Sequence, residues 1–327
     1  MHMVTGGAGF IGSNLVAALE ERAAGPIAVC DPRGGLKEKN LAKHAVAHRV
    51  EPDRLIEFLG DHRRDVEGVF HLGAISSTTE PDLDLIERTN VGLSTDLWTW
   101  CADAGVRLIY ASSAATYGDG GRGFDDDGSV AALRALRPLN PYGRSKNKFD
   151  LRVAEAVAAG APRPPQWAGL KFFNVYGPNE YHKAGQTSVV HQIFPRAVRG
   201  EPARLFKSHH PDYPDGGQLR DFIWVGDCVA VMLWLLDRPA VSGLFNCGTG
   251  KARSFKDLAT AVYRALGKEP RIEYVPTPEA IRDRYQYFTQ ARMERLRAAG
   301  FDRPFTSLED GVAAYVRDYL SAADPYR

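Results

Sequence analysis

The sequence TGGAGFIGS at residues 5–13 decides the fold of this chain. The residues before it supply a short strand, and residues 10–21 carry apolar side chains at the spacing of one helix face. Glycines between a strand and a helix let the backbone approach a pyrophosphate, whose charge is bound by the free N–H groups at the start of the helix. The stretch therefore predicts a strand, a glycine turn and a helix that together bind a dinucleotide.

A second strand is predicted at residues 27–30, and Asp31 ends it about twenty residues beyond the glycines, where this motif expects an acidic residue. A carboxylate here accepts a hydrogen bond from the adenosine ribose and favours NAD, because it repels a 2′-phosphate. Arg33, Lys37 and Lys39 follow closely, and their positive charges favour NADP. These residues alone leave both dinucleotides open.

The composition excludes several classes of protein. The 327 residues include 41 Lys and Arg against 40 Asp and Glu, so the net charge of +1 offers no bulk field for nucleic acid or an anionic membrane. The longest apolar stretch, at residues 229–236, is too short to cross a bilayer, and no signal peptide precedes the first strand. The four cysteines, Cys30, Cys101, Cys228 and Cys247, lie far apart without metal-ligand spacing. We therefore expect a cytoplasmic protein without a metal, and we predict that the cysteines are buried.

Short apolar runs alternate with helical patterns, which predicts an α/β fold with a Rossmann-type, doubly wound parallel sheet and a smaller α/β substrate-binding domain. Further strands are expected at residues 69–72, 108–111 and 170–174, and helices at residues 94–104 and 142–159. Residues 1–170 and 222–248 are assigned to the dinucleotide-binding domain, and residues 171–221 and 249–327 to the substrate-binding domain. The stretch at residues 207–222 is expected to be irregular, and the acidic run at residues 125–127 to be a solvated loop.

Tyr142 and Lys146 stand four residues apart in NPYGRSK, on one face of a predicted helix. A tyrosine whose pKa is near 10 is a poor base at neutral pH, and a neighbouring ammonium stabilises its phenolate. Ser113 lies at the carboxyl end of a predicted strand, where open α/β sheets bind ligands, and it can hold a reacting oxygen in line. These three residues predict an acid/base site beside the dinucleotide.

The motifs resemble those of the extended short-chain dehydrogenase/reductases, which act on nucleotide sugars. The resemblance covers nearly the whole chain and includes HLGA at residues 71–74, SSAATYG at 112–118, FNVYGP at 173–178 and RDFIWVGD at 220–227. Within this family, the chain is most similar to the 6-epimerases of ADP-linked heptoses. The strings that carry this closer similarity are ISSTTE at residues 75–80, EYHK at 180–183 and RYQYFTQARMERLRAAGFDRPF at 284–305.

The resemblance implies a reaction and a second catalytic group. Carbon 6 of an aldoheptose has no adjacent carbonyl, so inversion is expected to proceed by transient oxidation with a bound nicotinamide and hydride return to the opposite face. The ketone presents opposite faces in the two half-reactions, and the second acid/base group maps onto Lys183. In the resembled epimerases an aspartate and a downstream lysine coexist with NADP. Lys37 matches that lysine, so NADP is expected rather than NAD.

The resemblance also implies a binding site for each ligand. The dinucleotide contacts are Gly6, Gly7, Gly9, Phe10, Ile11, Gly12, Asp31, Pro32, Lys37, Leu72, Gly73, Ala74, Ile75, Ser76, Asn90, Lys146 and Val175. The contacts to the ADP-heptose are Ser76, Asn174, His191, Gln192, Phe206, Arg220 and Tyr285, with Arg220 suited to the diphosphate. Leu72 replaces an acidic residue of some members, Asn179 replaces an arginine of others, and the loop at residues 208–218 is longer. A homo-oligomer is also expected.

Other functions stay open. Another nucleotide-sugar epimerase, such as a UDP-hexose 4-epimerase, would share the cofactor site and Tyr142. A dehydratase is disfavoured because Ala114 and Ala115 stand where the dehydratases carry an acidic pair. A non-catalytic nicotinamide sensor is disfavoured because serine, tyrosine and lysine are all present. His209 and His210 have no third ligand at metal spacing and are interpreted as loop residues.

Overall fold

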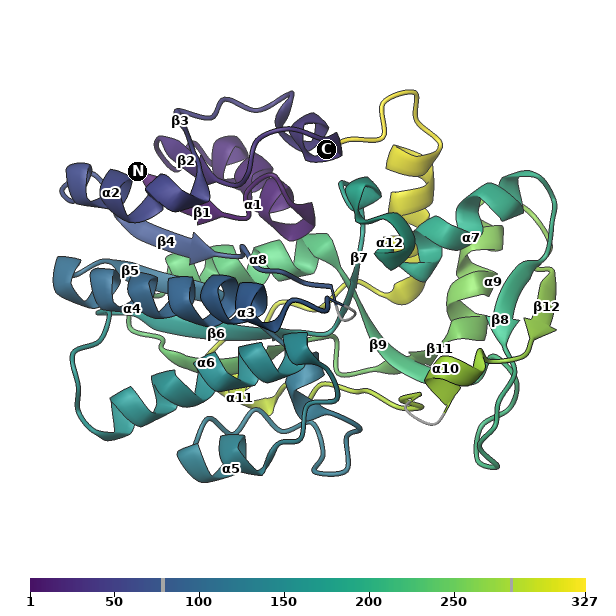
Figure 1. Cartoon of the computed structure of the whole chain (residues 1–327). Helices are drawn as coiled ribbons and strands as arrows, with labels where there is room; N and C mark the ends of the chain where they lie inside the picture. The colour runs from purple at the N-terminus through teal and green to yellow at the C-terminus, as the bar shows by residue number, and fades with distance from the viewer. Residues whose placement is uncertain (78–79, 283–284) are drawn as a thin grey trace.

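The fold is described by a computed structural model that covers residues 1–77, 80–282 and 285–327. Thr78, Thr79 and Arg284, which belong to two of the motifs quoted above, lie outside the described residues. The chain forms a larger lobe around a seven-stranded sheet and a smaller lobe that carries α7, α9 and α12 (Figure 1).

The large sheet is parallel, with the strand order β10-β6-β5-β4-β1-β2-β3. Its strands are β1 (His2–Thr5), β2 (Ile27–Cys30), β3 (His48–Val50), β4 (Gly68–His71), β5 (Arg107–Ser113), β6 (Trp167–Phe172) and β10 (Gly243–Cys247). The longer helices and turns of this lobe are α1 (Phe10–Glu21), η1 (Leu36–Leu41), α2 (Leu55–Asp61), η3 (Glu87–Gly92), α4 (Leu93–Ala104), η4 (Ala114–Tyr117), α6 (Pro141–Ala158) and α8 (Val225–Leu236). Shorter elements are η2 (Pro52–Arg54), α3 (Leu83–Ile86), α5 (Val130–Ala135) and α11 (Glu294–Ala298).

Both faces of this sheet are buried. Successive residues of one strand point to opposite faces, so Met3 joins one hydrophobic cluster and Val4 the other. Leu97 of α4 and Phe149 of α6 pack in the first cluster, while α1 and α8 cover the second (Figure 1). Parallel strands covered by helices on both faces are typical of the doubly wound fold, so the predicted fold class is confirmed.

The smaller lobe contains a three-stranded sheet, β11-β9-β7, and a two-stranded one, β12-β8. Its strands are β7 (Asn174–Tyr176), β8 (Ala203–Phe206), β9 (Leu219–Trp224), β11 (Ala252–Ser254) and β12 (Ile272–Val275). Its helices and turns are η5 (Tyr181–Gln186), α7 (Val189–Val198), α9 (Phe255–Ala265), α10 (Glu279–Arg282), α12 (Leu308–Ala314) and η6 (Tyr315–Leu320). A third hydrophobic cluster, which includes Tyr176, Val262 and Val312, fills this lobe.

Most predicted elements are present, and three predictions need correction. The stretch at residues 207–222 is not irregular throughout, because residues 219–222 belong to β9, which pairs with β7 and β11. The helix at residues 10–21 and the strand at residues 27–30 have the predicted bounds. The strand expected at residues 170–174 is two strands, because the N–H of Phe173 donates to the Cys247 carbonyl at 3.1 Å and Asn174 then pairs with β9. The prediction of a solvated loop at residues 125–127 is wrong for Asp126, which is buried and accepts a 2.7 Å hydrogen bond from the N–H of Asn246.

Three further expectations concern larger features of the chain. All four cysteines are buried and free, as predicted. None of the helices in the described ranges is long and apolar enough to cross a membrane. The proposed domain boundaries at 170 and 222 fall inside β6 and β9, while β10 belongs to the large sheet, so the exact division into domains stays a prediction.

Candidate active site

The glycine turn between β1 and α1 is built by close backbone contacts. Gly6 has a φ of +66°, and a Cβ there would lie 2.7 Å from the amide nitrogen of Gly73. A Cβ on Gly12 would lie 2.1 Å from the carbonyl oxygen of Gly6. The first turn of α1 carries no acidic residue, and Gly9 provides no side-chain cap. The N–H groups of this turn, which include those of Phe10 and Ile11, therefore fit the pyrophosphate of a dinucleotide.

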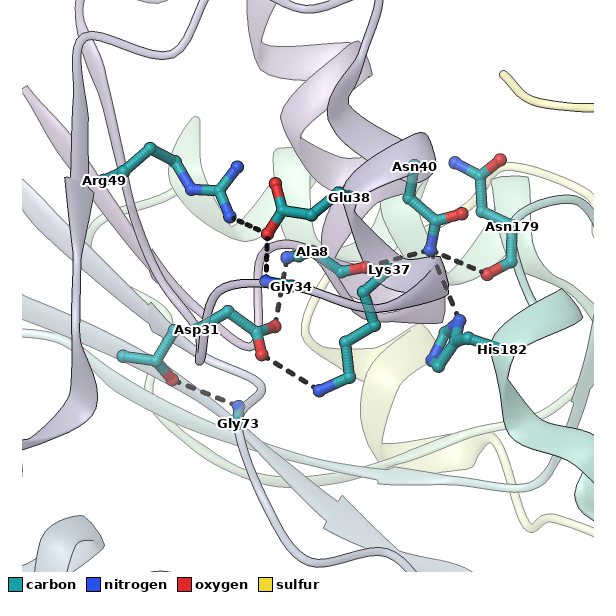
Figure 2. Close-up of polar contacts among 11 residues, drawn as sticks. Ala8, Asp31, Gly34, Lys37, Glu38, Asn40, Arg49, Gly73, Asn179 and His182 are labelled. Atoms are coloured by element: carbon teal, nitrogen blue, oxygen red, sulfur yellow. Dashed lines mark hydrogen bonds and ion pairs between the residues drawn. The ribbon is translucent and has the colours of Figure 1, made fainter.

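Asp31 and Lys37 lie together beside this turn (Figure 2). The buried carboxylate of Asp31 accepts hydrogen bonds from the N–H of Ala8 at 3.1 Å and from the ammonium of Lys37 at 3.0 Å. Arg33 instead forms a 3.5 Å ion pair with Glu51. Of the two cations, Lys37 is therefore the one that lies beside the carboxylate predicted to receive the ribose.

The segment after β4 is held against the glycine turn. The N–H of Gly73 donates to the Thr5 hydroxyl at 3.1 Å. The buried amide of Asn90 accepts from the N–H of Ile75 at 2.8 Å and donates to the Ile75 carbonyl and the Ser145 hydroxyl, each at 3.0 Å. The amide of Asn90 thus fixes the backbone of the predicted dinucleotide segment. Leu72 and Ala74 in this segment are half-buried, Ser76 is exposed, and Pro32 across the site is exposed.

His71 lies at the centre of this region, and no role was predicted for it from the sequence. Its Nδ1 is 2.7 Å from the Thr5 hydroxyl and its Nε2 is 2.8 Å from the Ser94 hydroxyl. Ser94 donates its own proton to the Asn90 carbonyl, so Nε2 is the protonated nitrogen of a neutral ring. Burial, with a smaller contribution from the charge of Lys146, lowers the pKa of His71 to about 3. The sequence feature that could have pointed to His71 is its position as the first residue of the HLGA motif.

Ser113, Tyr142 and Lys146 are brought together at the carboxyl end of β5. Asn140 caps α6 by accepting from the N–H of Gly143 at 2.8 Å, which sets Tyr142 in the first turn and Lys146 one turn later. Burial raises the pKa of the half-buried Tyr142, and a hydrogen bond with Ser113 opposes that rise. Burial lowers the pKa of Lys146 to about 8, against the charge of Asp150.

A buried ion pair lies behind this group. The ammonium of Lys171 is 2.9 Å from the carboxylate of Asp150, and the two side chains are 1% and 0% exposed. Asp150 also accepts from the Ser112 hydroxyl at 2.6 Å and the Tyr110 hydroxyl at 3.2 Å. Lys171 belongs to β6, whereas Ser112 and Tyr110 belong to β5, so these contacts fix α6 against both strands. Asp150 stands one helical turn beyond Lys146, so the contacts also hold the part of α6 that carries Lys146.

Lys183 reaches the glycine turn from η5. Its ammonium lies 5.3 Å from the centre of the Phe10 ring, in the first turn of α1. Burial lowers the pKa of Lys183, and the buried carboxylate of Glu180 opposes that effect. Lys183 is therefore a half-buried amine beside the glycine turn rather than a solvated loop lysine.

The predicted aromatic and arginine contacts of the smaller lobe form one group. The rings of Phe206 and Tyr285 are 6.0 Å apart, and the guanidinium of Arg220 lies 5.5 Å from the centre of the Tyr285 ring. Arg220 is buried and also donates to the carbonyls of Leu219 and Gln286. The long loop lies against this group, because the N–H of His209 donates to the Tyr287 hydroxyl and the Tyr287 ring packs 5.4 Å from that of Tyr285.

The predicted substrate contacts Asn174, His191 and Gln192 lie on β7 and α7 of the smaller lobe. Asn174 is exposed at the start of β7, and Val175 beside it is half-buried. His191 of α7 is half-buried, with its ring 5.5 Å from that of Tyr181. The exposed Gln192 donates its amide to the Thr187 carbonyl at 2.7 Å. The roles of these residues stay predictions. Among the residues that the structure describes, no cluster of three or more His, Cys, Asp or Glu side chains could hold a metal ion.

The parallel sheet, its glycine turn and the paired tyrosine and lysine define a class of nicotinamide-dependent enzymes. The chain belongs to the NAD dependent epimerase/dehydratase family, whose sequence model matches residues 2–248. It is 50% identical to the ADP-L-glycero-D-manno-heptose-6-epimerase of Nitratidesulfovibrio vulgaris, with 100% of each chain covered. It is 42% identical to the protein of the same name from Fusobacterium nucleatum, again over 100% of each chain.

Solved structures agree with this assignment. The crystal structure of Helicobacter pylori ADP-L-glycero-D-manno-heptose-6-epimerase has a TM-score of 0.80 at 26% identity, with 98% of this chain and 96% of that one covered. The Thermus thermophilus UDP-glucose 4-epimerase, solved in complex with NAD, has a TM-score of 0.75 at 28% identity, with 98% and 99% covered. The resemblance found in the sequence is therefore confirmed at the level of the family.

Proposed function

We propose that this chain inverts carbon 6 of ADP-D-glycero-D-manno-heptose to give the L-glycero epimer, using bound NADP. The observation that carries the proposal is the position of Lys183. Its ammonium lies beside Phe10 at the glycine turn, whereas Tyr142 approaches from α6 with Ser113 and Lys146. Two acid/base groups on separate elements are what a reaction that works on both faces of one carbon requires.

Carbon 6 carries a secondary alcohol, and no neighbouring carbonyl acidifies its C–H bond. When bound, the nicotinamide supplies the redox chemistry, by taking the carbon 6 hydrogen with its electron pair and returning it. The protein must therefore remove and restore the hydroxyl proton for each of two epimers. It must also let the ketone turn between the two steps.

Tyr142 serves one epimer. Its phenolate takes the hydroxyl proton and becomes the phenol as the alcohol becomes a ketone, and Ser113 holds the same oxygen by a hydrogen bond. The ammonium of Lys146, one turn along α6, stabilises the phenolate form of Tyr142. The buried Lys171–Asp150 pair supports this arrangement by fixing α6 against the sheet.

Lys183 serves the other epimer. Burial lowers its pKa, which increases the fraction of neutral amine that can accept a proton near neutral pH. After the ketone turns, Lys183 is the group that protonates the oxygen as the second alcohol forms. In the reverse direction the two residues exchange these roles.

The smaller lobe binds the nucleotide part of the substrate. Phe206 and Tyr285 offer aromatic surfaces for the adenine or the sugar, and Arg220 offers a guanidinium for the diphosphate. Asn174, His191, Gln192 and Ser76 are proposed to contact the sugar hydroxyls. The full-length relatives named as ADP-L-glycero-D-manno-heptose-6-epimerases support this choice of substrate.

NADP is proposed rather than NAD because Lys37 is anchored beside the ribose position by Asp31. The carboxylate by itself would favour NAD. The paired ammonium offsets the negative charge and offers donors to a 2′-phosphate.

The experiment supplies the purified protein with ADP-D-glycero-D-manno-heptose in deuterated water and follows the sugar by proton NMR. We expect inversion at carbon 6 with hydrogen retained there, because the hydrogen does not exchange with solvent. Substantial deuterium at carbon 6 would exclude the redox route. Inversion of a UDP-hexose at carbon 4, with no action on the heptose, would assign the chain to the UDP-hexose 4-epimerases. Denaturing the protein should release a nicotinamide dinucleotide, which identifies the cofactor directly.

A further inference from the structure

The turn that carries Lys183 is tied to the dinucleotide segment by two asparagines, Asn40 and Asn179, to which the sequence analysis assigned no function. Asn40 lies in the last turn of η1, a few residues after Lys37, and its side chain is buried. Its amide donates to the Ala8 carbonyl at 2.9 Å and to the Asn179 carbonyl at 3.0 Å, and lies 3.4 Å from Nδ1 of His182 (Figure 2). One side chain thus bridges the glycine turn and the residues around Lys183.

Asn179 is the other half of this bridge. It is 0% exposed and adopts a left-handed φ of +72°, an uncommon conformation for a residue other than glycine. Its side chain donates to the Ser13 hydroxyl of α1 at 3.0 Å and accepts from the N–H of Arg327 at 3.0 Å. Its backbone and side chain therefore contact three separate segments of the chain.

Residues 324–327 hold the same turn from its other side. The Tyr181 hydroxyl donates to the Pro325 carbonyl at 2.7 Å, and the Tyr181 ring packs 5.2 Å from that of Tyr326. Arg327 forms a 3.0 Å ion pair with Glu21 of α1. The yellow C-terminal segment accordingly leaves the smaller lobe and returns to the purple N-terminal part of the chain (Figure 1).

These contacts surround Lys183 without using its ammonium. The N–H of Lys183 donates to the Glu180 carbonyl at 3.0 Å, and Ala184 after it has a φ of +48°. Left-handed backbone conformations such as those of Asn179 and Ala184 persist only where the surrounding structure fixes them. The position of the Lys183 ammonium over Phe10 therefore depends on the segments that Asn40 and Asn179 join.

We propose that Asn40 and Asn179 are positioning residues that couple the dinucleotide segment to Lys183. The proposal rests on the proposed function, in which Lys183 is the second acid/base group. When the segment proposed to hold the adenosine ribose is fixed in place, the hydrogen bond from the Asn40 amide to the Asn179 carbonyl also fixes the turn at residues 180–186 that follows Asn179. Neither asparagine touches the reacting atoms.

The first test measures backbone amide hydrogen exchange at residues 181–187 in Asn40→Ala and in Asn179→Gly, each saturated with dinucleotide. Glycine at 179 tolerates the left-handed φ, so this variant removes the side-chain contacts without straining the backbone. We expect exchange to become at least about fivefold faster in this segment, the effect of losing about one net hydrogen bond. Unchanged exchange in both variants would overturn the proposal.

Asn246→Ala is the matched control. Asn246 is also a buried asparagine whose amide bridges two backbone carbonyls, those of Phe124 at 2.8 Å and Arg292 at 2.9 Å. Its loss should destabilise the protein while leaving exchange at residues 181–187 unchanged. If Asn246→Ala accelerates that exchange as much as Asn40→Ala does, the effect is general destabilisation and the proposal is wrong.

A double-mutant cycle shows whether the asparagines act through Lys183. We expect Asn40→Ala to lower kcat by up to about 10²-fold with a smaller change in dinucleotide affinity. In a Lys183→Met background the same change should lower kcat no further. Equal losses in the two backgrounds would overturn the positioning role. Full turnover of Lys183→Met by itself would instead refute the two-base function, a result that the exchange measurements do not depend on.

Discussion

The ammonium of Lys37 lies 3.0 Å from the carboxylate of Asp31, and the two side chains differ sharply in exposure, at 38% and 3%. The buried carboxylate also accepts the N–H of Ala8, so it is fixed to the glycine turn. The ion pair with Asp31 anchors the ammonium of Lys37, while part of the Lys37 side chain stays accessible to solvent. The pair therefore offers a carboxylate acceptor and an ammonium donor at one site, as the proposed contacts to a ribose hydroxyl and a 2′-phosphate require.

Replacing Lys37 tests the choice of dinucleotide. Lys37→Ala should weaken NADP binding by about tenfold or more, because one charge-assisted hydrogen bond to a phosphate is lost, and should weaken NAD binding much less. Calorimetric titration of the stripped protein with each dinucleotide measures both affinities. Arg33→Ala is the control, since Arg33 pairs with Glu51 and should not discriminate between them. Equal losses for NADP and NAD in Lys37→Ala would mean that Lys37 does not contact the 2′-phosphate.

The two acid/base groups can be removed separately. Tyr142→Phe and Lys183→Met should each lower kcat by about 10² to 10⁴, the usual contribution of a general acid or base. Circular dichroism should show that both variants fold. The exposed Lys251 supplies a control, because Lys251→Met should turn over normally. Near-normal turnover of Lys183→Met would leave Tyr142 as the single acid/base group.

His71 makes stability depend on pH. Its pKa is about 3 in the folded protein and about 6.5 in the unfolded chain, so between these values only the unfolded chain binds the proton. The free energy of unfolding therefore rises with pH across this window and falls on acidification, by about 2 kcal/mol between pH 7 and pH 5.

Urea unfolding at pH 7 and pH 5 measures this effect. We expect His71→Asn to lower stability at pH 7, because buried hydrogen bonds are lost, and to reduce the further loss at pH 5. The exposed His209 gives the control, and His209→Asn should retain the pH dependence of the original protein. An unaltered pH dependence in His71→Asn would show that another group is responsible.

Replacing only one partner of the buried Lys171–Asp150 ion pair should lower the free energy of unfolding substantially. Lys171→Met leaves a buried carboxylate without its cation, and we expect a loss of about 3–5 kcal/mol in the free energy of unfolding. Adding Asp150→Asn should recover part of that loss, because the unpaired charge is removed. Arg204→Met, which breaks an exposed pair with Glu273, should cost only about 0–1 kcal/mol. A comparable cost for the two single variants would contradict this account.

Local patterns in the sequence predict much of the fold. The glycines at 6, 9 and 12 predict the turn because close backbone approach within it is a local requirement, and the structure has Gly12 packed against the carbonyl oxygen of Gly6. Helix α1 and strand β2 have the predicted bounds. Tyr142 and Lys146 share a face because four residues span about one helical turn. Such features depend on residues close in sequence.

The tertiary structure decided what depends on distant segments. The sequence could not show that Asp126 is buried or that Lys171 pairs with Asp150, and it singled out Lys37 over Arg33 only through a resemblance. It suggested Lys183 only through a resemblance, whereas the folded chain has that ammonium over Phe10. Asn40 carried no local signal, and Asn179 was noted only because it replaces an arginine of other family members. Side-chain amides become bridges only when packing brings two backbones within reach. Periodicity and turn chemistry thus determine the elements, and the packing of residues far apart in the sequence determines the site.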